Sequence, residues 1–316
     1  MQGKEQTIYV GIDVSRARLD VHLHPSDERF AVGNDAAGRR QLVRRLRQLD
    51  IALVAIEPTG TFHRALHRHL HAAGLATALV DPLRARRFAQ AIGQLAKNDR
   101  IDAAMLALMA ERLSPAPTAP PDPAQEHLAE LATARTAAIA EQVALDNRRA
   151  ATTDPWLRRT LGCRSRGIVR HIARLDRQIE TAIAQAPAIA RRAAVLRSIP
   201  GVGPVTALAF LAYLRELGQL TAKQVAAMAG LAPIARDSGT SSGQRRIRGG
   251  RAALRQALYM SALVASRYNP NLAETYRRLR DAGKPPKVAL VAIARKLAIL
   301  ANRLVAENRT WTPIPA

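Results

Sequence analysis

Apolar residues are grouped in two different ways along this chain. Up to residue 113, short apolar runs alternate with segments whose leucines recur every three or four residues, which predicts strands alternating with helices. The predicted strands contain the stretches YVGIDVS, RLDVHLHP, FAVGND, IALVAIEP and LATALVDP. The predicted helices contain AAGRRQLVRRLRQL and FHRALHRHLHAAG. Three strands before the first helix, followed by single strands between helices, indicate an α/β domain with a mixed sheet.

A proline-rich stretch separates this region from a second, helical one. The segment SPAPTAPPDP (114–123) holds five prolines, which do not fit inside a regular element, so we expect a linker. A long helix beyond it has apolar residues in steps of four and three, typical of a coiled-coil seam: Ile168, Ile172, Leu175, Ile179 and Ala182. So short a seam fits a helix pair within one chain and a dimerising arm equally well.

The predicted organisation therefore has three parts. Residues 1–113 form an α/β domain, and residues 114–194 form the linker and a helical, coiled-coil segment. Residues 195–316 form a mainly helical domain, because apolar residues with helical spacing are interrupted there only by glycine- and proline-containing loops.

The charge of the chain bears on its partners, because the formal net charge is +23 and is unevenly spread. Residues 1–113 carry 17 basic and 12 acidic side chains, residues 114–194 carry 12 and 8, and residues 195–316 carry 19 and 5. Such a balance indicates a polyanionic partner, most simply nucleic acid, bound chiefly by the last part. The single cysteine, Cys163, excludes an internal disulfide and a cysteine-based zinc site. No signal peptide or apolar span is recognisable, so we expect a cytoplasmic protein with no membrane partner.

Four carboxylates in the first part are candidates for a metal site. Asp13 and Glu57 lie at the ends of predicted strands, and Asp99 and Asp102 are three residues apart on a predicted helix, which places them on one face. Such a set needs cations, and Mg²⁺ takes carboxylate ligands together with substrate phosphates. The alternative for the last two is a helix N-terminus, with Asp99 as the capping residue.

Two features of the last part are candidates for phosphate binding. The glycines of SIPGVGP, Gly201 and Gly203, lie where a turn enters a helix, which fits a helix-hairpin-helix contact to a DNA backbone and a plain connecting turn equally well. Further on, three serines, Ser238, Ser241 and Ser242, lie in a glycine-rich stretch. They are flanked by the arginines Arg236, Arg245, Arg246, Arg248 and Arg251.

This serine-arginine stretch has two interpretations. It is either a basic loop that grips phosphates, with serines as turn formers, or the site of a serine nucleophile whose attack on phosphorus the arginines assist. A hydrolase triad does not fit, because no histidine follows His171.

Taken together, these motifs resemble the transposases of the insertion-sequence "IS one-ten" family, which includes the Piv-type DNA invertases. The resemblance covers nearly the whole chain and rests on YVGIDVSRARLDV, AIEPTGTFHRAL, KNDRIDAAMLA, LRSIPGVGPVTA and LAPIARDSGTSSGQRRIRGG, in this order. It implies a RuvC-like domain of ribonuclease H fold whose DEDD set is Asp13, Glu57, Asp99 and Asp102. It also implies a C-terminal transposase domain in which Ser238 is the catalytic serine.

The resemblance further implies partners and a mechanism. The expected function is Mg²⁺-dependent strand cleavage and exchange on target and donor DNA through a covalent phosphoserine intermediate, guided by a structured non-coding RNA encoded by the element. The expected assembly is a homo-oligomer, a dimer or tetramer, in which the acidic site of one subunit completes the serine site of another. The alternatives are a RuvC-like nuclease that hydrolyses branched DNA, and a basic nucleic-acid-binding protein with a decayed acidic set.

Overall fold

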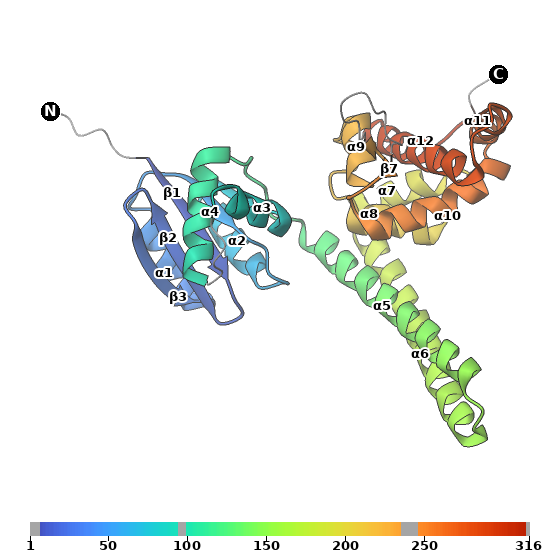
Figure 1. Ribbon diagram of the computed structural model, residues 1–316, viewed down its shortest axis with the longest axis horizontal. Coiled ribbons are helices and arrows are strands. Elements are labelled where there is room, and N and C mark those ends of the chain that lie inside the picture. Colours follow the sequence, from blue (N-terminus) through green and yellow to red (C-terminus); the bar gives the residue numbers. More distant parts are fainter. Residues whose placement is uncertain (1–6, 94–98, 235–245, 314–316) are drawn as a thin grey trace. The chain divides into compact units, whose positions relative to one another are not determined.

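A computed structural model describes residues 7–93, 99–234 and 246–313, and the chain divides into two compact units, 1–120 and 121–316. The first unit contains β1 (Ile8–Val14), β2 (Arg18–His24), β3 (Glu28–Gly33), α1 (Ala36–Leu46), β4 (Ile51–Ile56), α2 (His63–Ala72), β5 (Thr77–Leu79), α3 (Pro82–Ala91) and α4 (Asp99–Leu113). Figure 1 shows the strands of this unit as one sheet with helices on both faces.

The sheet of the first unit is mixed, as the sequence predicted. Its strand order is β3-β2-β1-β4-β5. The first three strands pair antiparallel, whereas β4 and β5 run parallel to β1. On one face, Val10, Ile12 and Val14 pack with leucines of α1 and α2, and on the other face Leu53 and Ala55 pack with α3 and α4. Helices therefore cover both faces of the sheet, which explains why β4 is apolar throughout and β1 is free of charged residues up to Asp13.

The second unit is mostly helical, also as predicted. It contains α5 (Pro123–Ala151), α6 (Pro155–Gln185), α7 (Pro187–Arg197), α8 (Pro204–Tyr213), α9 (Ala222–Met228), β6 (Pro233–Ile234), β7 (Arg246–Ile247), α10 (Ala252–Tyr268), α11 (Pro270–Asp281) and α12 (Pro286–Ala306). Its core is built around Phe210 of α8, with apolar residues from α7, α10 and α12. No helix in the described ranges is long and apolar enough to cross a membrane.

Helices α5 and α6 form a long antiparallel hairpin that extends from the other helices of the second unit (Figure 1). Each begins with Asp-Pro, in which the aspartate accepts a hydrogen bond from the first helical turn and the proline occupies the first helical position. Leu175 and Ile179 of the predicted seam are buried, and α6 packs along α5 of the same chain. The seam therefore serves a helix pair within one chain.

Candidate functional site

Two of the predicted acidic residues are brought together by the pairing of β1 with β4. In this parallel pair Ile12 lies opposite Ile56, and Asp13 and Glu57 follow these residues directly. Neighbouring strands in a sheet are about 4.8 Å apart. Both carboxylates are partly buried. The register therefore places Asp13 and Glu57 side by side at the carboxyl end of the two central strands.

Helix α4 brings Asp102 to the same face of the sheet. Its backbone lies so close to β1 that a Cβ on Gly11 would be 1.9 Å from the carbonyl oxygen of Ala103. Asp13 projects to the same face as Gly11, because side chains two residues apart on a strand share a face. Asp102 is partly buried and lies one turn before Leu106, which is fully buried against the sheet.

A fifth carboxylate, which the sequence reasoning missed, lies beside this set. Asp20 of β2 is directly opposite Asp13 in the antiparallel pair, so both side chains project to the same face. Arg18 holds the Asp20 carboxylate through hydrogen bonds of 2.8 and 3.0 Å from Nη2 and Nε to Oδ1. The alternation of apolar and polar residues in RLDVHLH, which includes Asp20, is visible in the sequence. Only the strand register shows that Asp20 lies opposite Asp13. We name the edge formed by Asp13, Asp20, Glu57 and Asp102 the acidic edge.

The oxygen donors of the acidic edge are of the type that Mg²⁺ prefers, and they come from β1, β2, the residue after β4 and α4. Within the described residues, no three His, Cys, Asp or Glu side chains form a group arranged to hold a metal ion. Asp99 is the first residue of α4, and its side chain lies outside the described part, so its role as ligand or helix cap stays a prediction.

In the second unit, the ends of the serine-arginine stretch are fixed, although Ser238, Ser241, Ser242, Arg236 and Arg245 lie outside the described residues. Strands β6 and β7 pair antiparallel, with Pro233 opposite Ile247. Behind them the chain is so tight that a Cβ on Gly230 would be 2.2 Å from the carbonyl oxygen of Gly249. The amide of Arg251 also donates a hydrogen bond of 2.8 Å to the carbonyl oxygen of Met228. Ile234 and Arg246, the described residues on either side of 235–245, are therefore paired with each other.

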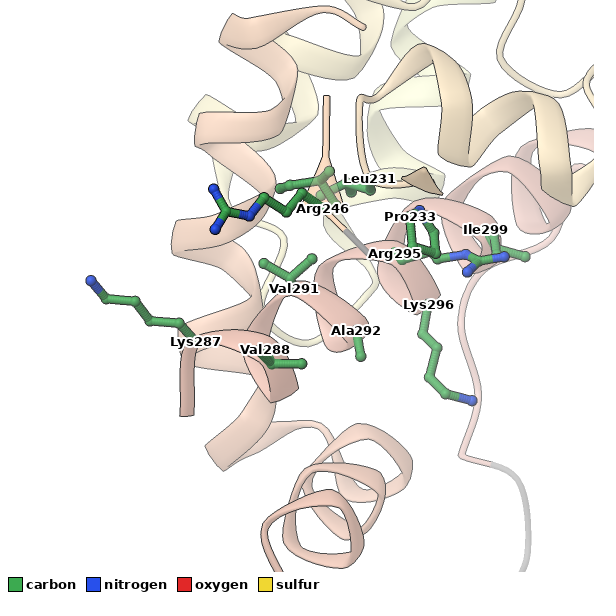
Figure 2. Close-up of a pocket in the computed structure, with 11 residues that line it drawn as sticks. Leu231, Pro233, Arg246, Lys287, Val288, Val291, Ala292, Arg295, Lys296 and Ile299 are labelled. Atoms are coloured by element: carbon green, nitrogen blue, oxygen red, sulfur yellow. The ribbon is translucent and has the colours of Figure 1, made fainter. Parts of the chain in front are cut away.

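A cavity of about 760 Å³ lies next to this place (Figure 2). Leu231 and Pro233 form one side, and one face of α12 forms the other, including Val288, Val291 and Ile299. Its cationic residues are Arg246, Lys287, Arg295 and Lys296, and none of the described residues that line it is acidic. Figure 2 shows Lys287 and Lys296 extending to either side of the apolar α12 face. The sequence reasoning missed these α12 cations, because that helix was interpreted only by its apolar face.

Of the remaining candidate arginines, Arg246 and Arg248 are exposed, whereas Arg251 is held by an acid. The Arg251 guanidinium donates hydrogen bonds of 2.8 and 2.9 Å to the two carboxylate oxygens of Glu216. Burial alone would raise the pKa of Glu216, but the hydrogen bonds from Arg251 and the nearby positive charge hold it below its usual value. Arg251 therefore ties the start of α10 to Glu216.

The two glycines of the SIPGVGP turn have different surroundings. Gly201 has φ +100°, and a Cβ there would lie 2.7 Å from the Cβ of Ala265 in α10. Gly203 precedes α8 and has no heavy atom within 4 Å of the place where a Cβ would stand. The first glycine is needed for close packing, and the second leaves the start of α8 open to an approaching group.

Comparison with known proteins assigns the class of this protein. A family model described as "Transposase", of the DEDD type, matches residues 10–154, which include Asp13, Glu57, Asp99 and Asp102. A second model, described as "Transposase IS116/IS110/IS902 family", matches residues 193–277, which include both glycines and the serine-arginine stretch. The chain belongs to this family of insertion-sequence transposases, which are DNA-modifying enzymes.

The individual relatives fall into two groups. The chain is 27% identical to the "Pilin gene-inverting protein" of Moraxella bovis over 96% of this chain and 97% of that protein, and a protein of the same name in Moraxella lacunata is equally similar. An uncharacterised protein of insertion element IS116 from Streptomyces clavuligerus is 34% identical over 39% of this chain and 32% of that protein. The resemblance predicted from the sequence is thereby confirmed.

Proposed function

We propose that this chain is a DNA recombinase that cuts and rejoins strands through a covalent bond between Ser238 and DNA, in transposition or in inversion as the name of the Moraxella relatives suggests. The observation that carries the proposal is that one chain matches both transposase models in order, the first over the acidic edge and the second over the serine-arginine stretch. The order of strands in the first unit supports a RuvC-like, ribonuclease H fold for it.

In the proposed reaction the Oγ of Ser238 bonds to a DNA phosphorus while the bond from that phosphorus to one of its sugar oxygens breaks. The hydroxyl proton leaves to a base, and the departing sugar oxygen takes up a proton. Arg246 and Arg248, at the end of the stretch, are exposed and would bind the phosphate and offset the charge that develops on it. Attack by the freed sugar hydroxyl of another strand on the phosphoserine completes the exchange.

The acidic edge has a separate task in this proposal. Asp13, Glu57 and Asp102, with Asp99, would hold Mg²⁺, which supplies charge stabilisation at the oxygens of the reacting phosphate. The donor set fits a hard cation, since every member is a carboxylate. The serine lies in the second unit, and we propose that the acidic edge of one subunit serves the serine of another in a dimer or tetramer. Guidance by an RNA from the element belongs to the same proposal, and the net charge of +23 supports it.

The experiment uses the whole protein with labelled DNA and RNA made from the sequences flanking its gene. After reaction with Mg²⁺, a denaturing gel separates free cut DNA from DNA attached to protein, and mass analysis of digested adduct locates the modified residue. We expect an adduct at Ser238 that Ser238→Ala abolishes, while Ser241→Ala and Ser242→Ala keep it. Cut DNA without an adduct would instead identify a hydrolytic nuclease, and an adduct on another residue would refute the assignment of Ser238.

A further inference from the structure

Helix α6 carries arginines along the face that points away from α5. Trp156, Arg159, Cys163, Arg166 and Arg170 follow one another in steps of three and four, and all are exposed. The buried residues Leu161, Leu175 and Ile179 lie on the opposite side, against α5. The same steps continue to Arg174 and Arg177, which are also exposed. We name this surface the arginine face; its members are Trp156, Arg159, Arg166, Arg170, Arg174 and Arg177.

The arginine face is not neutralised by acids. Within the described residues, no ion pair joins any of its five arginines to a carboxylate. Asp146, on the neighbouring turn of α5, accepts a hydrogen bond of 2.8 Å from Ser165. Arg149 of α5 adds a further cation, since a Cβ on Gly162 would lie 3.5 Å from its Nη1 and 3.7 Å from Nη1 of Arg166. The two guanidinium groups close to this glycine add to the local positive charge, which an approaching anion would offset.

Trp156 gives this surface a second property. Its side chain is 66% exposed in the first turn of α6, at the tip of the hairpin. A large aromatic ring in this position is available for stacking, and nucleic-acid bases stack on exposed aromatic side chains regardless of their sequence. The neighbouring Leu157 is 40% exposed and has no aromatic ring. Substitutions of Trp156 and of Leu157 can therefore distinguish stacking of a base from burial of an apolar side chain.

The charges and the exposed tryptophan of the arginine face favour a nucleic-acid strand over a second copy of this chain as its partner. A second copy of the same face would bring ten arginines together with no compensating acid, so pairing between copies is disfavoured. From Trp156 to Arg177 the helix rises about 30 Å, and the five arginines follow one another at one-turn steps of about 5 Å, except that Cys163 takes the turn between Arg159 and Arg166. A nucleic-acid strand presents phosphates at a comparable spacing, and only unpaired nucleotides offer a base face to Trp156.

We propose that the arginine face binds a DNA strand that is locally unpaired, with the phosphates on Arg159, Arg166, Arg170 and Arg174 and one extrahelical base stacked on Trp156. This inference rests on the proposed function, because strand exchange creates unpaired DNA that must be held. It adds a binding surface on the α5–α6 hairpin, distant in sequence from both the acidic edge and the serine-arginine stretch.

The test compares binding of the whole protein to a duplex and to the same duplex with an unpaired bubble, measured by fluorescence anisotropy without Mg²⁺. We expect the wild-type protein to bind the bubble more tightly. Trp156→Ala should weaken bubble binding by roughly 5- to 150-fold, the range found for loss of one stacked base, with little change for the duplex. Trp156→Phe should keep most of the affinity, and Leu157→Ala, the matched control, should keep all of it.

The arginines are tested by the salt dependence of the same binding. The combined variant Arg166→Gln, Arg170→Gln and Arg174→Gln should lower the slope of log affinity against log salt by about 2 for the bubble, since each phosphate contact to a single strand contributes about 0.7. The control removes three exposed arginines of α3 (Arg84→Gln, Arg86→Gln and Arg87→Gln). It should leave the ratio of bubble to duplex affinity unchanged.

Three outcomes would overturn the inference. The ratio of bubble to duplex affinity could be the same in Trp156→Ala as in the wild type. An RNA bubble could bind more tightly than the DNA bubble and depend equally on Trp156. Trp156→Ala could change the oligomeric state measured by sedimentation, which would make the face a protein interface. A wild-type protein that binds no duplex at all would contradict the proposed function itself, and is thereby distinguished from failure of the arginine face alone.

Discussion

The acidic edge of the first unit and the cationic cavity of the second unit gather charges of opposite sign. In the first unit, Asp13 and Glu57 are side by side on paired strands, and Asp20 lies directly opposite Asp13 with an arginine bound to it. In the second unit, Arg246, Lys287, Arg295 and Lys296 line one cavity in which no described lining residue is acidic. Each cluster of like charges costs folding free energy, which a ligand of opposite charge recovers. A cation for the first and a phosphate for the second are the complementary ligands.

The largest expected effect comes from removing charge at the acidic edge. Asp13→Asn and Asp102→Asn each keep the side-chain shape, so folding should persist, but strand cleavage should fall by at least about 100-fold because a hard ligand charge is lost. The measurement is single-turnover cleavage on a gel, with DNA affinity measured in parallel. Asp20→Asn is the control at the same edge and should keep cleavage near the normal rate, because the Asp20 carboxylate is bound by Arg18 and is not among the proposed metal ligands. If Asp102→Asn cut DNA at the normal rate, Asp102 would be only a residue of the first turn of α4.

A large effect on stability is expected at Gly201 and a small one at Gly203. Gly201→Ala places a methyl group 2.7 Å from the Cβ of Ala265 at φ +100°, and should cost at least about 2 kcal/mol of unfolding free energy. Gly203→Ala meets no atom within 4 Å and should cost well under about 1 kcal/mol. Urea unfolding measures both variants. A loss of DNA affinity in Gly203→Ala at unchanged stability would show that nucleic acid approaches the start of α8, as the sequence suggested.

The Glu216–Arg251 pair should make the second unit sensitive to acid. The folded-state pKa of Glu216 lies below its unfolded value, so the pair contributes stability above the unfolded carboxyl pKa, and this is lost as the pH falls through the folded pKa. Because Glu216 is 37% exposed, the expected contribution is only about 1 kcal/mol. Unfolding free energy measured between neutral and acidic pH should fall less in Arg251→Gln than in the wild type. Equal pH dependence in the two would contradict a folding role for the pair.

The smallest effect is expected from single arginines at the base of the serine-arginine stretch. Arg246→Gln and Arg248→Gln should each reduce the salt slope of DNA binding by about 1, with no change in sequence preference, if each binds one phosphate. Arg251→Gln, whose guanidinium is already bound to Glu216, should change the slope less. Affinities measured at several salt concentrations separate the three variants. A changed sequence preference at constant slope would show that Arg246 or Arg248 contacts bases.

The helices and strands could be predicted from the sequence, because each depends on a local pattern. The apolar run IALVAI and the largely apolar IYVGIDV become the paired strands β4 and β1, and Asp-Pro pairs start α5 and α6. Family membership also followed from the sequence, because it depends on the order of short motifs, which the matching transposase models confirm. The predicted division at residues 113 and 194, the metal ligands and the catalytic serine stay predictions.

Tertiary structure decided which residues meet, because that depends on strand register and helix packing between residues far apart in the sequence. Asp13 and Glu57 are 44 positions apart and become neighbours only through the pairing of β1 with β4. Asp20 joins them through the register of β2, and Arg251 is engaged by Glu216, which no motif indicated. Gly201 and Gly203 look alike in SIPGVGP, but only the packing of α10 shows that Gly201 alone has no room for a side chain. Local patterns specify elements, whereas contacts between elements specify the site.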